Sequence, residues 1–104
     1  MNELELCPKF EAAFELIGKR WTGLIIRVLL DGGKRFKEIK EVIPEMSDRM
    51  LVERLKELEA KRILQRRVYP EIPVRIEYQL TEKGRALEPV MNEMQKWAER
   101  WVDI

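Results

Sequence analysis

Histidine is absent from this 104-residue sequence, and cysteine occurs once, at Cys7. Without histidine, one chain cannot build a Cys/His zinc site, a Ser-His-Asp triad or an imidazole general base. A single cysteine cannot form an intrachain disulfide, which agrees with a reducing compartment, so we expect a cytoplasmic protein. Paired acids, a glycine-rich phosphate loop and internal repeats are also missing. We therefore expect no enzyme, no metal and no cofactor, with carboxylate-only catalysis as the remaining enzymatic alternative.

Long apolar runs are missing as well. No stretch approaches the roughly 20 apolar residues that span a membrane, and the first residues, MNELELCPK, lack the apolar core of a secretory signal. We therefore expect no membrane partner. Apolar residues make up 45% of the sequence, which is enough for one modest core. The length and composition predict a single domain over residues 1–104.

Charged side chains are plentiful but nearly cancel, to a net charge of +1. Their distribution is more informative than their sum. Residues 19–37 carry six positive and one negative side chain, and residues 61–75 carry five positive and one negative. If these basic segments lie on one face of the fold, they could contact DNA phosphates on both sides of an inserted helix. An ordinary mixed, solvated surface is the alternative that stays open.

The segment SDRMLVERLKELEAKRIL, residues 47–64, predicts the helix around which the chain is arranged. Ser47 is a favourable N-cap. Apolar side chains then recur at helical spacing, at Leu51, Leu55 and Leu58. A shorter predicted helix, residues 36–43, precedes it across a turn that contains Pro44, which is the order of a helix-turn-helix. In that motif the second helix enters the DNA major groove, with its N-terminal residues nearest the base edges.

The predicted helix is polar on the face opposite its leucines. We predict DNA contacts from the residues at its N-terminal end: Ser47, Asp48, Arg49, Met50 and Glu53. Arg49 could bind guanine, and Glu53 could accept a hydrogen bond from cytosine. The alternative is an ion pair between Arg49 and Glu53, four residues apart on a solvated face.

Two strand-like runs follow, residues 64–69 and 74–80, joined by a tip that contains Pro70 and Pro73. The second run alternates apolar and polar residues, and the prolines prevent regular pairing at the tip and stiffen it. A hairpin this small is only marginally stable alone, so it must pack against the helices. The order of elements therefore predicts a wing beside the helix-turn-helix.

Basic side chains of the wing and of the segment before the first helix of the motif are predicted to reach phosphates or the minor groove. They are Lys34, Arg35, Arg66, Arg67 and Arg75. The alternative is that the wing arginines pair with Glu71 and Glu77 of the same hairpin.

Helical patterns also fill both ends of the chain. A first helix is predicted from Pro8 to Gly18, a second and most buried one from Trp21 to the Asp31 turn, and a last one from Thr81, where Pro89 either kinks or restarts it. The apolar stripe of the last helix exceeds what a small core needs. We predict a homodimer interface formed by the first and last helices, at Phe10, Phe14, Met91, Met94, Trp97 and Trp101. The alternative is that this stripe folds back onto its own core.

The predicted fold is therefore mostly α with a small β-hairpin, a winged helix-turn-helix whose terminal helices form a dimer interface. A symmetric dimer would place two recognition helices about 34 Å apart, which selects an inverted-repeat operator in double-stranded DNA.

Several motifs, found in this order, carry a family resemblance. They are the Cys-Pro opening, the Gly-Lys-Arg-Trp turn, the Arg-Phe start of the third helix, the wing YPEIPVRIEYQLT and the Thr-Glu-Lys-Gly start of the last helix. With them the chain resembles, over nearly its whole length, the HxlR-type winged helix-turn-helix regulators, relatives of the MarR family. The resemblance implies a homodimeric bacterial transcription factor, often a repressor, with DNA contacts from the helix holding Arg49 and from the wing around Arg75.

Cys7 is the residue whose role is least determined by its pattern. A lone cysteine is more often an inert small residue than a sensor. A helix N-terminus and Lys9 favour a thiolate there, whereas Glu5 and Glu11 oppose it. The resemblance implies more, because some members of this family with an N-terminal Cys-Pro respond to quinones, electrophiles or oxidants through that cysteine.

We therefore predict a repressor that oxidation or electrophile modification of Cys7 releases from its operator. With one cysteine per chain, the available products are a Cys7 bridge between subunits, a mixed disulfide with a small thiol, or a quinone or other electrophile adduct. Two alternatives stay open, namely a winged-helix regulator without redox sensing and a protein–protein interaction module.

Overall fold

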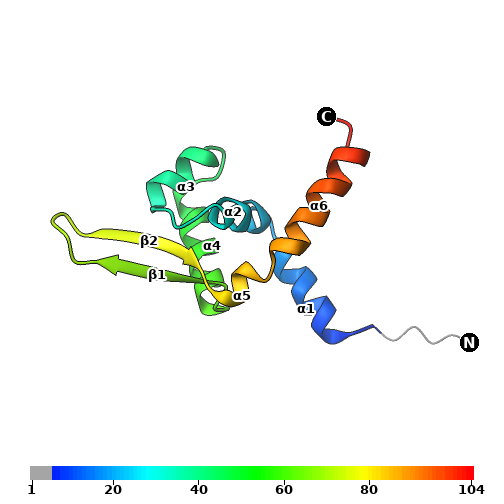
Figure 1. The fold of residues 1–104 in the computed structure, drawn as a ribbon, viewed down its shortest axis with the longest axis horizontal. Helices are drawn as coiled ribbons and strands as arrows, with labels where there is room; N and C mark the ends of the chain where they lie inside the picture. The colour runs from blue at the N-terminus through cyan, green and yellow to red at the C-terminus, as the bar shows by residue number, and fades with distance from the viewer. Residues whose placement is uncertain (1–5) are drawn as a thin grey trace, which may run out of the picture.

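The structure is a computed structural model, and it describes residues 6–104. Its elements, in chain order, are α1 (Pro8–Ile17), α2 (Thr22–Leu30), α3 (Phe36–Val42), α4 (Asp48–Ala60), β1 (Leu64–Tyr69), β2 (Arg75–Leu80), α5 (Glu82–Arg85) and α6 (Glu88–Trp101). In Figure 1, α2, α3 and α4 gather at the base of the β1–β2 hairpin, which projects to one side, while α1 and α6 extend to the other. The predicted winged helix-turn-helix, mostly α with a small hairpin, is confirmed.

The core lies where α2 meets α3, α4 and the base of the hairpin. Ile25, Ile26 and Leu29 of α2 are fully buried, which agrees with the prediction that this helix is the most buried one. They join the buried leucines of α4 in one apolar cluster, which also holds Ile39 of α3. Burial of one stripe of each helix explains why these short helices hold together, since isolated helices of this length are marginal in water.

The hairpin is anchored at its base and solvated at its tip. Its strands are antiparallel, with a register that runs from Leu64 opposite Leu80 to Tyr69 opposite Arg75. Leu64 and Leu80 are buried, so the base packs into the core as the prediction requires. The segment before α3 pairs briefly with the second strand, because the Lys34 amide donates to the Tyr78 carbonyl at 3.0 Å and the Tyr78 amide donates to the Lys34 carbonyl at 2.7 Å.

The last predicted helix is divided into α5 and α6, with a turn at Ala86 and Leu87. Pro89 therefore restarts the helix instead of kinking it, since it lies in the first turn of α6, where its missing amide hydrogen has no intrahelical partner to lose. Thr81 caps α5 as predicted, with its hydroxyl accepting a hydrogen bond from the Gly84 amide at 3.2 Å.

The end of α3 differs from the prediction. Val42 is 59% exposed, whereas Ile43 is buried. The reason is that α3 ends at Val42, one residue earlier than predicted, and Ile43 leaves the helical geometry to turn into the core. No helix among residues 6–104 has both the length and the apolar character that crossing a membrane needs.

Candidate nucleic-acid interface

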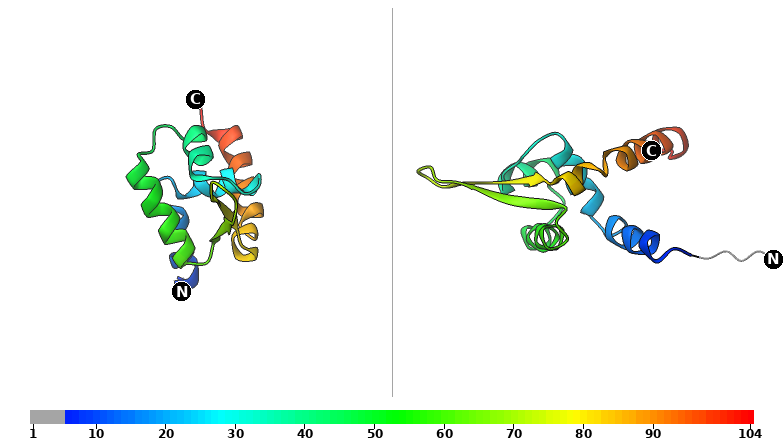
Figure 2. Two further views of the ribbon diagram at one scale, coloured as in Figure 1. Left: turned by 90° about the vertical axis from the view of Figure 1, so that its left-hand side faces the viewer. Right: turned by 60° about the horizontal axis from the view of Figure 1, so that its bottom comes forward.

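Helix α4 presents its N-terminal half to solvent. The Ser47 hydroxyl accepts a hydrogen bond from the Met50 amide at 3.1 Å, so the predicted N-cap is formed. Leu51, Leu55 and Leu58 are buried, which orients the helix. The opposite face is therefore exposed, at Arg49, Glu53 and Lys56, with Met50 half-buried beside it. Figure 2 shows α4 lying to one side of the hairpin, away from the ends of α1 and α6.

Arg49 and Glu53 do not form the ion pair that was the alternative to DNA contact. Within the described part of the chain, neither side chain takes part in an ion pair. Both are therefore unengaged on the face that a major groove would meet. Their contact with bases stays a prediction.

Lys40 holds the turn between α3 and α4, a role that sequence patterns did not reveal. Its ammonium group donates to the carbonyl of Pro44 at 3.2 Å and to that of Met46. It also lies 3.8 Å from a carboxylate oxygen of Asp48, the first residue of α4. Lys40 thus satisfies carbonyls of the turn and fixes the direction in which α4 leaves it.

Arg54 is the second residue that sequence reasoning missed. An arginine in a charged helix is usually solvated, yet Arg54 is only 8% exposed. Its Nε donates to the Arg20 carbonyl at 2.9 Å, and its Nη1 donates to Glu57 at 3.2 Å. Lys19 reaches the same Glu57 carboxylate at 2.8 Å. The turn between α1 and α2 is thereby tied to the middle of α4.

Replacing Glu57 by glutamine tests this contact, because the stability that the Glu57 carboxylate contributes depends on pH. The hydrogen bond from Lys19 is the main cause that holds the pKa of Glu57 below its ordinary value of 4.5. Such a carboxylate stabilises the fold above the unfolded pKa, and its contribution is lost as pH falls through the lower folded pKa. We expect the wild type to unfold at higher urea than Glu57→Gln at pH 7, with the two converging below pH 4.5. A difference in urea midpoint between the wild type and Glu57→Gln that stays constant down to pH 3 would contradict this explanation.

The basic segment before α3 lies beside the wing. Arg35 occupies the N-cap of α3, where its backbone amide donates to Glu38 Oε1 at 2.7 Å. Its Nε lies 3.9 Å from the same oxygen, and its side chain stays 57% exposed. Lys34 is more engaged, since its backbone pairs with Tyr78 and its ammonium group lies 3.5 Å from Asp31. Arg35 is therefore better placed than Lys34 to contact a phosphate.

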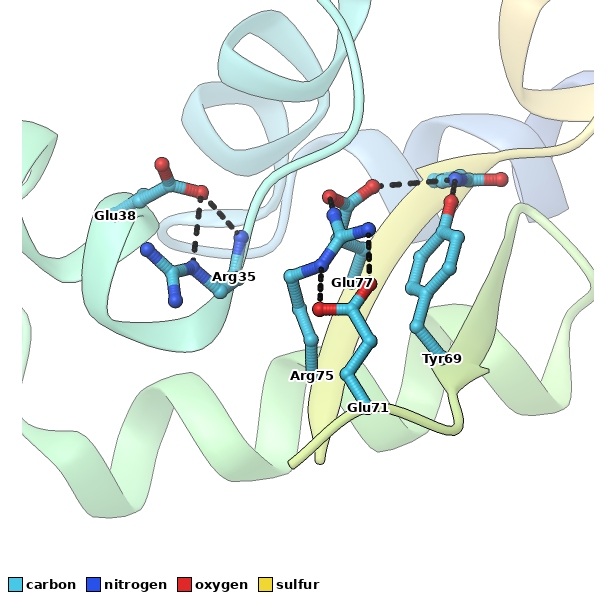
Figure 3. A network of polar contacts seen from close by, with 7 residues as sticks. Arg35, Glu38, Tyr69, Glu71, Arg75 and Glu77 are labelled. Atoms are coloured by element: carbon cyan, nitrogen blue, oxygen red, sulfur yellow. Dashed lines mark hydrogen bonds and ion pairs between the residues drawn. The ribbon is translucent and has the colours of Figure 1, made fainter. Parts of the chain in front are cut away.

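The three wing arginines differ in their surroundings. Arg66 and Arg67 on β1 are exposed, and neither forms an ion pair with any residue between positions 6 and 104. Arg75 on β2 instead binds the carboxylates of Glu71 and Glu77, as Figure 3 shows. The alternative of pairing within the hairpin is thus realised for Arg75 and not for the other two.

The terminal helices expose the apolar side chains that were predicted to form a dimer interface. Phe10, Phe14, Met94, Trp97 and Trp101 are each more than half exposed. Phe10, Phe14 and Met94 border an apolar groove of about 680 Å³ between α1, α2 and α6. The stripe therefore does not fold back onto its own core. Met91 is the exception, because it is 6% exposed and belongs to the core, so it can offer a partner little surface.

Cys7 is exposed and occupies the N-cap of α1. Together with Phe10 and Phe14 it lines a shallow surface pocket, so the thiol sits at the edge of the exposed aromatic face. Among residues 6–104, no group of three His, Cys, Asp or Glu side chains is placed to hold a metal ion. The reactive group available at this end of the molecule is the thiol.

Comparisons with known proteins agree with this geometry. Residues 16–104 match the family model described as HxlR-like helix-turn-helix. The chain is 60% identical over 98 residues to the HTH-type transcriptional regulator YodB of Bacillus subtilis (strain 168), which spans 94% of this chain and 88% of YodB. The structure of quinone-bound YodB from B. subtilis is similar with a TM-score of 0.81 at 58% identity, covering 91% of this chain and 100% of that one. The structure of the redox regulator HypR in its oxidised form is similar with a TM-score of 0.87 at 42% identity, covering 94% and 100%. The motifs, the fold and these matches agree, and the chain belongs to the HxlR-like helix-turn-helix family.

Proposed function

We propose that this chain is a sequence-specific, DNA-binding transcriptional regulator, a homodimeric repressor that acts as a single domain in the cytoplasm and not as an enzyme. The observation that carries the proposal is the unengaged N-terminal face of α4. It is held from behind by buried leucines, by Lys40 at its start and by Arg54 at its middle. A helix fixed in this way loses little conformational freedom when it enters a major groove.

The contacts we propose fall into two classes. Base edges are read from the start of α4, by Arg49 and Glu53, with Ser47, Asp48 and Met50 beside them. Phosphates are bound by the wing and by the segment before α3, through Arg35, Arg66 and Arg67. Lys34 and Arg75 have smaller parts, because their side chains are less exposed and more closely paired than that of Arg35.

The partner that we propose for the apolar groove is a second copy of this chain. The groove is bordered by Phe10 and Phe14 of α1 and by Met94 of α6. Trp97 and Trp101 add exposed aromatic surface on α6, and an apolar stripe of this size calls for a partner. A two-fold dimer formed there uses the same face of both subunits, and it sets two α4 helices about 34 Å apart on an inverted repeat.

The signal that we propose is modification of Cys7. YodB has been solved bound to a quinone and HypR in an oxidised form, and Cys7 lies exposed at the edge of the proposed interface. The Cys7 thiolate adds to a quinone ring carbon and forms a C–S bond, and one quinone oxygen takes up a proton from solvent. The hydrogen of the attacked carbon is then lost from the ring while the second oxygen is protonated, which leaves a hydroquinone thioether. An oxidant instead takes two electrons from the Cys7 thiols of two subunits, which lose their protons and form one disulfide. Either product changes how α1 packs in the dimer and so the spacing of the two α4 helices.

The test is retention of DNA by the reduced protein from fragments of its own genome, including the DNA beside its gene. We expect selective retention that weakens steeply between low and physiological salt, because phosphate binding releases counterions. Retention of no fragment in either redox state would refute the DNA-binding proposal.

Cys7→Ser is the variant that separates sensing from binding. We expect it to retain the same fragment as the wild type with unchanged affinity, and to keep it after treatment with a quinone or diamide, because serine forms neither thioether nor disulfide. The wild type should release the fragment under the same treatment. Release by Cys7→Ser would show that another group responds, and retention by the treated wild type would reduce Cys7 to a surface residue.

A further inference from the structure

One face of the wing carries a continuous polar network. Tyr69 and Arg75 are opposite one another in the register, so their side chains share this face. Arg75 Nη2 donates to Glu71 Oε2 at 3.0 Å and Nε to Oε1 at 3.4 Å, while Nη1 donates to Glu77. The guanidinium carbon lies 3.9 Å from the centroid of the Tyr69 ring. Figure 3 shows Arg75 held between the two carboxylates beside this ring.

The network continues from the tip toward the base of the hairpin. Gln79 donates to Glu77 at 3.4 Å and to the Tyr69 hydroxyl at 3.3 Å. Near the base of the hairpin, the segment before α3 packs directly against this face. A Cβ atom built at Gly33 would lie 2.9 Å from side-chain atoms of both Glu77 and Gln79. The network thus links the tip of the wing to the body of the molecule.

This arrangement disfavours Arg75 as a phosphate ligand. A phosphate that approached the guanidinium would also approach the carboxylates of Glu71 and Glu77, which already offset the charge of Arg75 and occupy its donors. The hydrogen bond from Arg75 is also the main cause that holds the pKa of Glu71 below its ordinary value, so this carboxylate stays charged at neutral pH. Arg66 and Arg67 lie one strand away, and neither forms an ion pair in the part of the chain that the structure describes. Arg67 shares the face of the network, 5.3 Å from the centroid of the Tyr69 ring, whereas Arg66 lies on the opposite face.

We propose that Arg75 is a positioning residue that holds the wing in its DNA-binding conformation, and that Arg66 and Arg67 are the wing residues that bind phosphate. Planar, bidentate pairing combined with stacking on an aromatic ring is a role that lysine cannot fill. The inference rests on the proposed DNA binding for its functional part, while its structural part concerns the wing alone.

The experiment compares Arg75→Gln with Arg66→Gln, because each removes one positive charge from the hairpin and Arg66 lies on the face opposite the network. Affinity for the retained DNA fragment is measured against salt concentration for each. A lost phosphate contact lowers the slope of log affinity against log salt by about one. We expect that loss for Arg66→Gln. For Arg75→Gln and Arg75→Lys we expect affinity to fall about two- to tenfold with the wild-type slope, since the contacts are weakened by a loose wing and not deleted.

A second arm uses no DNA. Amide hydrogen exchange over residues 68–76 should become faster in Arg75→Gln, in Arg75→Lys and in Glu71→Gln, and stay at the wild-type rate in Arg66→Gln. Glu71→Gln weakens the network without changing Arg75, so it separates loss of the network from loss of the cation.

The outcomes separate the inference from the proposed function. A slope lowered by about one in Arg75→Gln, restored by Arg75→Lys, with unchanged exchange in the wing, would make Arg75 a phosphate ligand and overturn the inference. If the wild type retains no DNA, the proposed function fails, and the exchange arm alone decides whether Arg75 holds the wing.

Discussion

Gly84→Ala is expected to destabilise the fold by about 3 kcal/mol or more, because the added methyl group has no space. A Cβ atom at position 84 would lie 2.2 Å from the carbonyl oxygen of Ile63 and 3.0 Å from a methyl carbon of Leu80. The Ile63 carbonyl cannot move freely, since it accepts the Thr81 amide at 3.0 Å. Gly84 thus allows α5 to lie directly on the backbone that enters the hairpin.

Urea unfolding at a fixed protein concentration measures this effect, since the stability of a dimer depends on concentration. Gly23→Ala is the control, because no atom lies within 4 Å of a Cβ built there and the residue is helical in α2. Replacing that glycine should leave stability unchanged or raise it by up to about 1 kcal/mol. Equal unfolding midpoints for Gly84→Ala and the wild type would mean that α5 shifts to make room, and that its close packing is unimportant.

Trp97→Glu is expected to convert the proposed dimer to a monomer and to weaken operator binding by about 100-fold or more. Trp97 is 61% exposed on the apolar face of α6, so a carboxylate there costs the folded monomer little. In a dimer the same carboxylate would be buried against apolar side chains without a partner, which is costly. A monomer can engage only one half of an inverted repeat, so it loses the gain that comes from binding both halves together.

Light scattering coupled to size exclusion gives the mass of each species, and the DNA assay gives the affinity. Lys96→Glu is the matched control, since it places the same side chain one position earlier, where Lys96 is 74% exposed on the polar side of α6. It should stay dimeric with little change in affinity. A dimeric Trp97→Glu would place the interface elsewhere, and a wild-type monomer that binds DNA tightly would remove the dimer from the proposal.

Local patterns were sufficient for the elements of this fold. Alternation and helical spacing are properties of neighbouring residues, so the start of α4 with its cap at Ser47 and the bounds of β1 could be predicted before any contact was known. The end of α4 at Ala60 was not, since the predicted segment ran to residue 64. The order of these elements, the single cysteine and the absence of histidine then restricted the function to a narrow set. The exposed aromatic stripe was visible for the same reason, since its residues repeat along one helix face.

What the sequence by itself determined is therefore which segments form helices and strands, and which family they make. Tertiary structure alone decided which charged side chains are free. Arg54 and Arg49 lie on the same helix, yet only Arg54 is held, by a carbonyl of the turn between α1 and α2 and by a glutamate of α4. Arg75 and Arg67 lie on paired strands, yet only Arg75 forms ion pairs with carboxylates of the hairpin. Met91 likewise left the predicted interface because α6 packs one of its residues into the core. Periodicity gives the direction of a side chain from its own backbone, whereas its partners depend on how the elements meet in space.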